Sequence, residues 1–283
     1  MLTEDIRIEV AGVELAAKQW GDTDKPAIIA LHGWLDNAAS YDQLAPHLSQ
    51  YRIIALDFAG HGYSGHRPEG MHYHTMDNVD DVIGLADALD LNQFILMGHS
   101  MGAGIAAYTA ASFPDRVTKL VLIEGVGTHA SEPAEAPKIL RDAVEEMKKA
   151  GAKRKPVYDA RDEAIATRAQ AIGGISVEAS TVLCSRGLEV VGNGFTWRSD
   201  PRLKMTSTLR LTEALVQGFL AQLNMPVLLI QGEHSFVAKS NILEQRARYI
   251  ANCTNVTLPG NHHLHLEPDT CAAVASAVEA FLE

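Results

Sequence analysis

Short, continuous runs of apolar residues are the feature that most constrains the fold of this chain. They occur at 27–31, 53–56, 94–97, 120–123 and 227–230. Continuous runs of this length are typical of strands that are covered on both faces, as in a parallel sheet. Residues 6–17 instead alternate between apolar and polar side chains on either side of Ala11-Gly12, which predicts an antiparallel hairpin at the start.

Segments with helical spacing separate these runs. Apolar residues recur at helical intervals over 79–89 and 269–282, and residues 101–112 are rich in alanine. Strands that alternate with helices indicate βαβ units. The sequence therefore predicts an α/β protein with a doubly wound, mostly parallel sheet.

One long segment interrupts this alternation. Between about Val126 and Asn224 we find no strand-like apolar run, and charged, alanine-rich stretches such as 139–150 take its place. Because nearly a hundred residues exceed the length of a single crossover, we expect a mostly helical insertion between two strands of the sheet. A chain of 283 residues has room for one α/β core with such an insertion.

Charge and composition exclude several classes of function. The net charge of −11 argues against a nucleic-acid partner and against an anionic membrane surface, since both need a basic face. Three scattered cysteines form no disulfide framework, and the first residues lack the basic and apolar regions of a secretory signal. The apolar runs are also too short to span a bilayer. We therefore expect a cytoplasmic protein without a membrane span.

The strongest chemical signal is the pentapeptide Gly98-His99-Ser100-Met101-Gly102. It fits G-x-S-x-G and stands directly between a predicted strand and a predicted helix. A serine presented from such a tight turn needs a strained backbone, and glycines two residues away on each side avoid collisions with the neighbouring elements. The pattern predicts that Ser100 is a nucleophile.

A nucleophilic serine needs a base and donors for the developing oxyanion. His262, His263 and His265 follow a short late run at 255–258, so the loop that carries them can return over Ser100. Three histidines also suggest a metal site, but no partner motif such as H-E-x-x-H accompanies them, so we expect no metal. The backbone amides of Trp34, which closes an early strand, and of Met101 are the expected oxyanion donors.

Four motifs, taken in order, resemble the α/β-hydrolase superfamily. They are His32-Gly33-Trp34, the stretch DFAGHGYS at 57–64, the pentapeptide around Ser100, and GNHHLHLE at 260–267. The stretch LHGWLDNAAS at 31–40 is similar, more narrowly, to the serine hydrolase-like branch of that superfamily.

The resemblance implies an α/β-hydrolase fold: a mostly parallel eight-stranded sheet with helices on both faces and a helical cap inserted after strand six. The expected division is a core of 1–125 and 225–283 with a cap of 126–224. The resemblance also implies that His262 is the base and that His265 supports its loop.

The acid of the triad departs from the pattern of the family. Most members carry an Asp after strand seven in a pattern like G-x-x-D, whereas this chain has Ser235 at that position, and a hydroxyl cannot stabilise an imidazolium as an anion does. Glu124 follows the run 120–123, at the end of a central strand where ligands bind in open sheets. A subset of haloalkane dehalogenases resembles this arrangement, with a Glu after strand six. We predict Glu124 as the acid, with Glu233 as the alternative.

These residues predict a serine hydrolase that cleaves a carboxylic ester or a related small acyl compound through a Ser-His-Glu triad and an acyl-enzyme intermediate, without a cofactor. Dehalogenase and epoxide-hydrolase chemistry is disfavoured because those relatives carry Asp at the position of Ser100. Ser-dependent cleavage of C–C, amide or thioester bonds stays open, as does the oligomeric state. The alternative from another class is a non-catalytic protein of this fold that binds a ligand or partner, and Ser235 is its main support.

Overall fold

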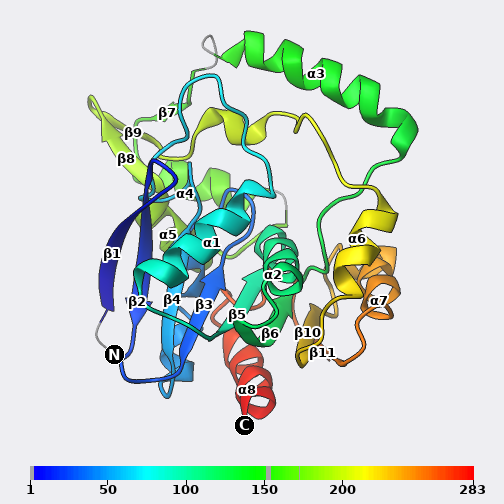
Figure 1. Cartoon of the computed structure of the whole chain (residues 1–283). Helices are drawn as coiled ribbons and strands as arrows, with labels where there is room; N and C mark the ends of the chain where they lie inside the picture. The colour runs from blue at the N-terminus through cyan, green and yellow to red at the C-terminus, as the bar shows by residue number, and fades with distance from the viewer. Residues whose placement is uncertain (1–2, 151–153, 172) are drawn as a thin grey trace.

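A computed structural model of this chain describes residues 3–150, 154–171 and 173–283. Its main sheet has eight strands, which confirms the predicted α/β-hydrolase fold (Figure 1). Across the sheet the strands are β1 (Thr3–Val10), β2 (Val13–Trp20), β4 (Arg52–Asp57), β3 (Ala27–Leu31), β5 (Phe94–His99), β6 (Val117–Ile123), β10 (Val227–Gly232) and β11 (Cys253–Leu258). The first two form the expected antiparallel hairpin, β2 also pairs antiparallel with β4, and all later neighbours are parallel.

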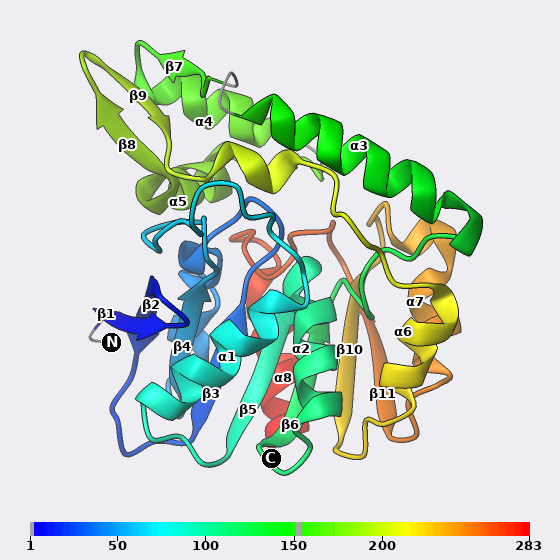
Figure 2. The same ribbon diagram turned by 45° about the horizontal axis from the view of Figure 1, so that its top comes forward.

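Helices cover both faces of this sheet (Figure 2). On one face lie α1 (Asp77–Ala88), α2 (Met101–Ser112), α6 (Glu213–Leu220) and α7 (Ile242–Ala247), and on the other lie α8 (Cys271–Leu282) and the short 3-10 helices η1 (Ala38–Tyr41) and η2 (Ala45–Leu48). Successive residues of a central strand enter opposite layers: Ile29 packs with the first group and Ile28 with the second. Both positions must therefore be apolar, which explains the continuous runs.

The segment between β6 and β10 contains more than helices. Its elements are η3 (Pro133–Glu135), α3 (Ala136–Lys148), β7 (Val157–Tyr158), α4 (Arg161–Ala169), α5 (Val177–Gly187), β8 (Leu188–Val191), β9 (Gly194–Trp197), η5 (Pro201–Lys204) and α6. Besides its helices, this segment contains β7, β9 and β8, which form a small antiparallel sheet that the sequence pattern did not indicate. These strands have two to four residues and are half exposed, so they produce no apolar run. Figure 2 shows α3, α4 and the small sheet above one end of the main strands.

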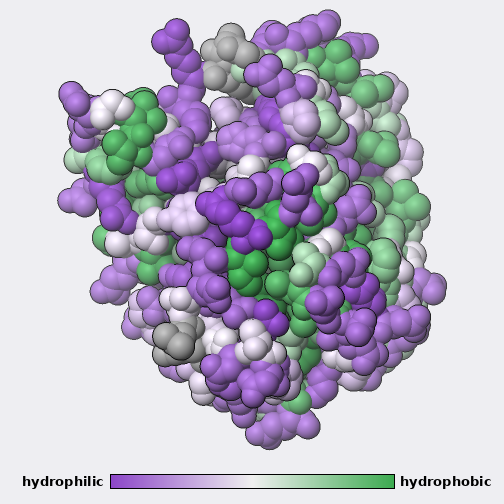
Figure 3. Space-filling model, turned by 60° about the vertical axis from the view of Figure 1, so that its left-hand side comes forward, coloured by the Kyte–Doolittle hydropathy of each residue, from purple (hydrophilic) through white to green (hydrophobic). Residues whose placement is uncertain are grey.

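The surface of the molecule carries many of its charged and polar side chains. The face shown in Figure 3 is mainly hydrophilic, and hydrophobic side chains gather in its central, hollowed part. Within the described parts of the chain, no helix combines the length and the apolar character that crossing a bilayer requires.

Candidate active site

Ser100 occupies a sharp turn between β5 and α2. Its backbone has φ 53° and ψ −113°, a conformation that non-glycine residues rarely adopt. The turn brings its flanks into close contact: a Cβ on Gly98 would collide with the Gly102 carbonyl, and one on Gly102 would lie 2.6 Å from the His32 carbonyl oxygen. Both glycines of the motif are therefore required by close packing, and the serine between them is held in a strained conformation.

A chain of hydrogen bonds runs from Ser100 through His262 to Glu124. The Ser100 hydroxyl lies 2.9 Å from His262 Nε2, and His262 Nδ1 lies 2.9 Å from Glu124 Oε2. Nδ1–H donates to the carboxylate, so Nε2 is free to accept the hydroxyl proton. The three residues come from the ends of β5 and β6 and from the loop after β11, and the Glu124 side chain is fully buried.

The Glu124 carboxylate has two further donors. The Gly232 amide donates to Oε1 at 2.5 Å, and the Ser235 hydroxyl donates to Oε2. The Val237 amide in turn donates to the Ser235 hydroxyl at 3.2 Å. Ser235, which stands where the family usually has its Asp, is thus a buried partner of the carboxylate. This contact was not predicted from the sequence, where its only signal is the serine at the position of the usual Asp.

Glu233 lies apart from this hydrogen-bond chain. Its side chain is exposed, and only its backbone amide, which donates to the Leu258 carbonyl, appears in the hydrogen bonds of the described chain. The structure therefore brings Glu124, and not Glu233, to His262.

Four more polar side chains, those of Asp36, His99, Arg168 and His263, line the space around Ser100, and of these Asp36 and Arg168 were not singled out from the sequence. Arg168 of α4 lies 2.6 Å from Asp36 Oδ1, and His263 Nε2 lies 3.3 Å from Asp36 Oδ2. Burial alone would raise the pKa of Asp36, but His263 and Arg168 hold this pKa well below its usual range. Asp36, His99 and His263 offer three ligand atoms within 4.8 Å of one another. Arg168 puts a positive charge into the same group, which opposes a metal ion there and favours an ion-pair network that ties α4 to the core.

Three further buried histidines near the site, His32, His61 and His265, are neutral. Burial lowers the pKa of His32 to about 4 and the pKa values of His61 and His265 to about 3. His265 Nε2 lies 2.9 Å from the Ser40 hydroxyl, which joins the loop of His262 to η1. These side chains hold loops in place and have no free charge to offer a ligand.

Ser100 opens into a cavity of about 440 Å³. Trp34, Leu35 and Phe236 form its apolar walls, and the Phe236 ring lies 4.6 Å from the His262 ring. Trp34 also lines a second hollow of about 300 Å³, which extends to Met101. Of the two expected oxyanion donors, Trp34 lines both spaces and Met101 lines the second one.

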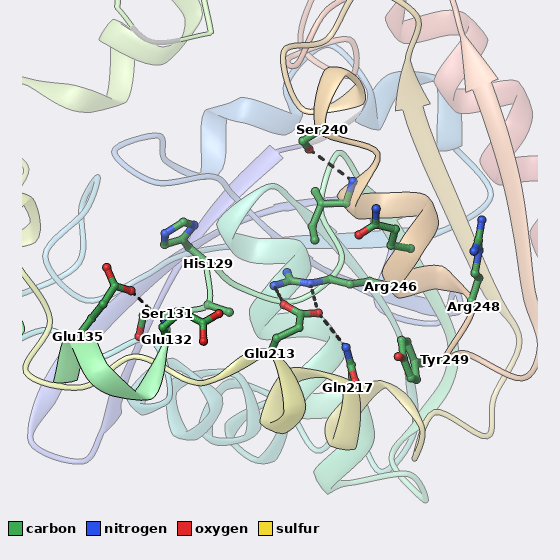
Figure 4. Close-up of a pocket in the computed structure, with 13 residues that line it drawn as sticks. His129, Ser131, Glu132, Glu135, Glu213, Gln217, Ser240, Arg246, Arg248 and Tyr249 are labelled. Atoms are coloured by element: carbon green, nitrogen blue, oxygen red, sulfur yellow. Dashed lines mark hydrogen bonds and ion pairs between the residues drawn. The ribbon is translucent and has the colours of Figure 1, made fainter.

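A cavity of about 920 Å³, larger than either space near Ser100, lies elsewhere (Figure 4). None of the residues predicted for catalysis lines it. Its central side chain is Arg246 of α7, which pairs with both carboxylate oxygens of Glu213 at 3.1 and 2.7 Å. Arg246 also donates to the carbonyls of Val126 and Thr128, each at 2.9 Å. One guanidinium thus ties both ends of the segment between β6 and β10 to α7.

Comparison with known proteins agrees with this geometry. The family model described as the alpha/beta hydrolase fold matches residues 26–164. A serine hydrolase-like protein of Dictyostelium discoideum is 36% identical over 93% of this chain and 78% of its own length. A hypothetical protein of Pseudomonas aeruginosa PAO1 has a crystal structure that is 41% identical with a TM-score of 0.95 over 99% of both chains. A thioesterase domain from the curacin biosynthetic pathway is 25% identical with a TM-score of 0.87, over 99% of this chain and 100% of its own.

Proposed function

Because this chain belongs to the serine hydrolase-like proteins of the α/β-hydrolase superfamily, we propose that it is an active hydrolase that cleaves an ester or a related acyl compound with Ser100 as its nucleophile. The observation that carries the proposal is the unbroken hydrogen-bond chain from Ser100 through His262 to Glu124. A protein that only binds a ligand needs neither this chain nor a strained serine, so the non-catalytic alternative leaves both features unexplained.

The proposed reaction has two stages. The Ser100 oxygen attacks the substrate carbonyl while its proton passes to His262 Nε2, and the amides of Trp34 and Met101 stabilise the oxyanion. The bond to the leaving group breaks as His262 returns the proton to it, which leaves an acyl ester on Ser100. Water then attacks this ester, with His262 again as the base, and releases the acid. Glu124 orients the imidazole and stabilises its charged form in both stages.

The surroundings of Ser100 bear on which bond is cleaved and on how the substrate is selected. An ester or a thioester suits this mechanism, and the structural likeness to a thioesterase domain supports the thioester as a second candidate. We propose that residues 126–224 act as a cap over the site. This role is supported by Arg168, which bonds to Asp36 from α4, and by Lys204, which lines the Ser100 cavity.

A fluorophosphonate probe tests the proposal directly. The probe reacts only with an activated serine, so the intact protein is expected to be labelled, with the adduct located on the Ser100 peptide by mass spectrometry. An excess of an ester that the protein hydrolyses should compete with the probe and prevent the labelling. Absence of labelling in a folded sample, under conditions in which a known serine hydrolase reacts, would favour the non-catalytic alternative.

The Ser235→Ala variant tests the role of the second donor to Glu124. Loss of a hydrogen bond to a buried charge is expected to lower kcat about tenfold, with little change in KM, because the carboxylate is held less firmly against His262. Ser235→Thr keeps the hydroxyl and serves as the matched control. An unchanged kcat in Ser235→Ala would show that the Gly232 amide alone positions Glu124.

A further inference from the structure

The hollow that Trp34 and Met101 line next to the Ser100 cavity is positively charged, although the chain as a whole carries a net charge of −11. The residues that line this space of about 300 Å³ include Lys204 and Arg210 and no Asp or Glu. Within the described ranges, neither cation is part of an ion pair, whereas the nearby Arg202 is paired with Asp200. The positive charge of Lys204 and Arg210 is therefore available to a ligand.

The backbone that carries Lys204 is held in place from several sides. The Trp34 indole donates to the Leu203 carbonyl at 2.9 Å, and the buried Asp200 pairs with Arg202. Arg202 also donates to three carbonyls of the facing loop, those of Arg67, Pro68 and Met71. A cation on such an anchored segment is preorganised, because its backbone loses little freedom when a ligand binds.

Arg210 lies on the continuation of the same segment, which is also anchored. The Thr206 amide donates to Glu146 of α3 at 2.7 Å, and the Ser131 amide donates to the Leu211 carbonyl at 3.0 Å. Arg210 lines both the hollow beside Met101 and a further hollow of about 720 Å³. The two cations thus follow one path that leads away from the nucleophile.

This path is continuous with the cavity of Ser100. Lys204 and Trp34 line both spaces, and the hollow extends to Met101, the residue after the nucleophile. A substrate whose carbonyl lies at Ser100 can therefore reach both the apolar cavity walled by Leu35 and Phe236 and the cationic hollow.

We propose that the substrate is an ester or thioester with an anionic group, a carboxylate or a phosphate, and that Lys204 and Arg210 bind this group. The inference rests on the proposed serine hydrolase function and adds the class of its substrate. A guanidinium and an ammonium together match the charge and the acceptor geometry of both anions. The uncharged part of the substrate occupies the apolar cavity.

Two matched pairs of substrates test the proposal and distinguish the two sources of charge. The 4-nitrophenyl monoester of adipic acid is compared with 4-nitrophenyl hexanoate, which places the anion on the acyl part. Butanoyl-coenzyme A is compared with the uncharged butanoyl thioester of N-acetylcysteamine, which places the anion on the leaving part. We expect kcat/KM to be about tenfold higher for the anionic member of at least one pair, and this preference to fall at high ionic strength.

Substitutions then assign the preference to the two cations. Lys204→Gln and Arg210→Gln should each reduce the ratio of anionic to neutral kcat/KM by about three- to fivefold, mainly through KM, because each removes one partly solvated ion pair. The matched control is Arg248→Gln, which removes the same charge from the lining of the separate cavity of Figure 4 and should leave the ratio unchanged.

Binding without turnover separates this inference from the proposed function. Adipate and coenzyme A are titrated calorimetrically against the Ser100→Ala protein, with and without Lys204→Gln and Arg210→Gln. Binding that weakens in these variants supports the anion site even if no substrate is turned over. Equal kcat/KM within both pairs, or binding that neither substitution weakens, would overturn the anion site while leaving Ser100 as a nucleophile.

Discussion

Replacing Ser100 with alanine is expected to lower kcat by a factor of about 10⁶ and to abolish labelling by fluorophosphonate. Among the described residues, the only side-chain hydrogen bond of the hydroxyl is the one with His262, so its removal eliminates the nucleophile and little else. Alanine is strained to a similar degree at φ 53°, so the melting temperature should stay close to that of the wild type. Initial rates on the preferred ester, with thermal unfolding of the same samples, make the measurement.

The control for this variant is a second serine at the other end of α2. Ser112 is exposed at the last residue of α2, and Ser112→Ala should keep both turnover and labelling. Equal hydrolysis by the wild type and Ser100→Ala would show that the measured activity comes from a different site or from a contaminant.

Replacing Glu124 with glutamine is expected to lower kcat by up to about 10⁴ with a modest change in KM. The side chain keeps its shape but loses the charge that stabilises the imidazolium, and an amide no longer selects the tautomer with the proton on His262 Nδ1. Glu233→Gln is the matched control, since it removes the same charge from an exposed side chain, and it should cost far less.

A second substitution sharpens this test. The Ser235 hydroxyl and His262 Nδ1 bond to the same oxygen of Glu124, so a carboxylate at position 235 can approach the imidazole from that side. Ser235→Asp in the Glu124→Gln background is therefore expected to restore part of kcat. Full activity of Glu124→Gln, with loss in Glu233→Gln, would reverse the assignment of the acid.

Local sequence pattern was enough to predict the layers of this protein. The apolar runs identified the central strands because every residue of a covered strand faces a hydrophobic layer, as Ile28 and Ile29 do. Apolar runs gave no sign of β7, β8 and β9, because these strands are short, half exposed and paired only with one another. Their stability comes from contacts within the insertion, which leave no periodic signal in a strand of two to four residues.

One part of the candidate site is a local structure that the sequence predicts, and another part depends on the order of the strands. The turn around Ser100 is a local structure, set by two glycines at fixed spacing, and the sequence predicted it with Glu124 at the end of a neighbouring strand. Which carboxylate meets His262 depends on the order of β5, β6 and β10 in the sheet and on the path of the loop after β11.

The partners of these residues were decided by tertiary structure alone. The bond from Ser235 to Glu124, the ion pair of Asp36 with Arg168, and the position of Lys204 beside Ser100 each join residues about a hundred or more positions apart. Spacing along the chain predicts contacts only within one turn, helix or hairpin, because its signal is the local repeat of the backbone. The local sequence was therefore sufficient to predict the nucleophile, whereas its electrostatic surroundings depend on how distant segments pack against it.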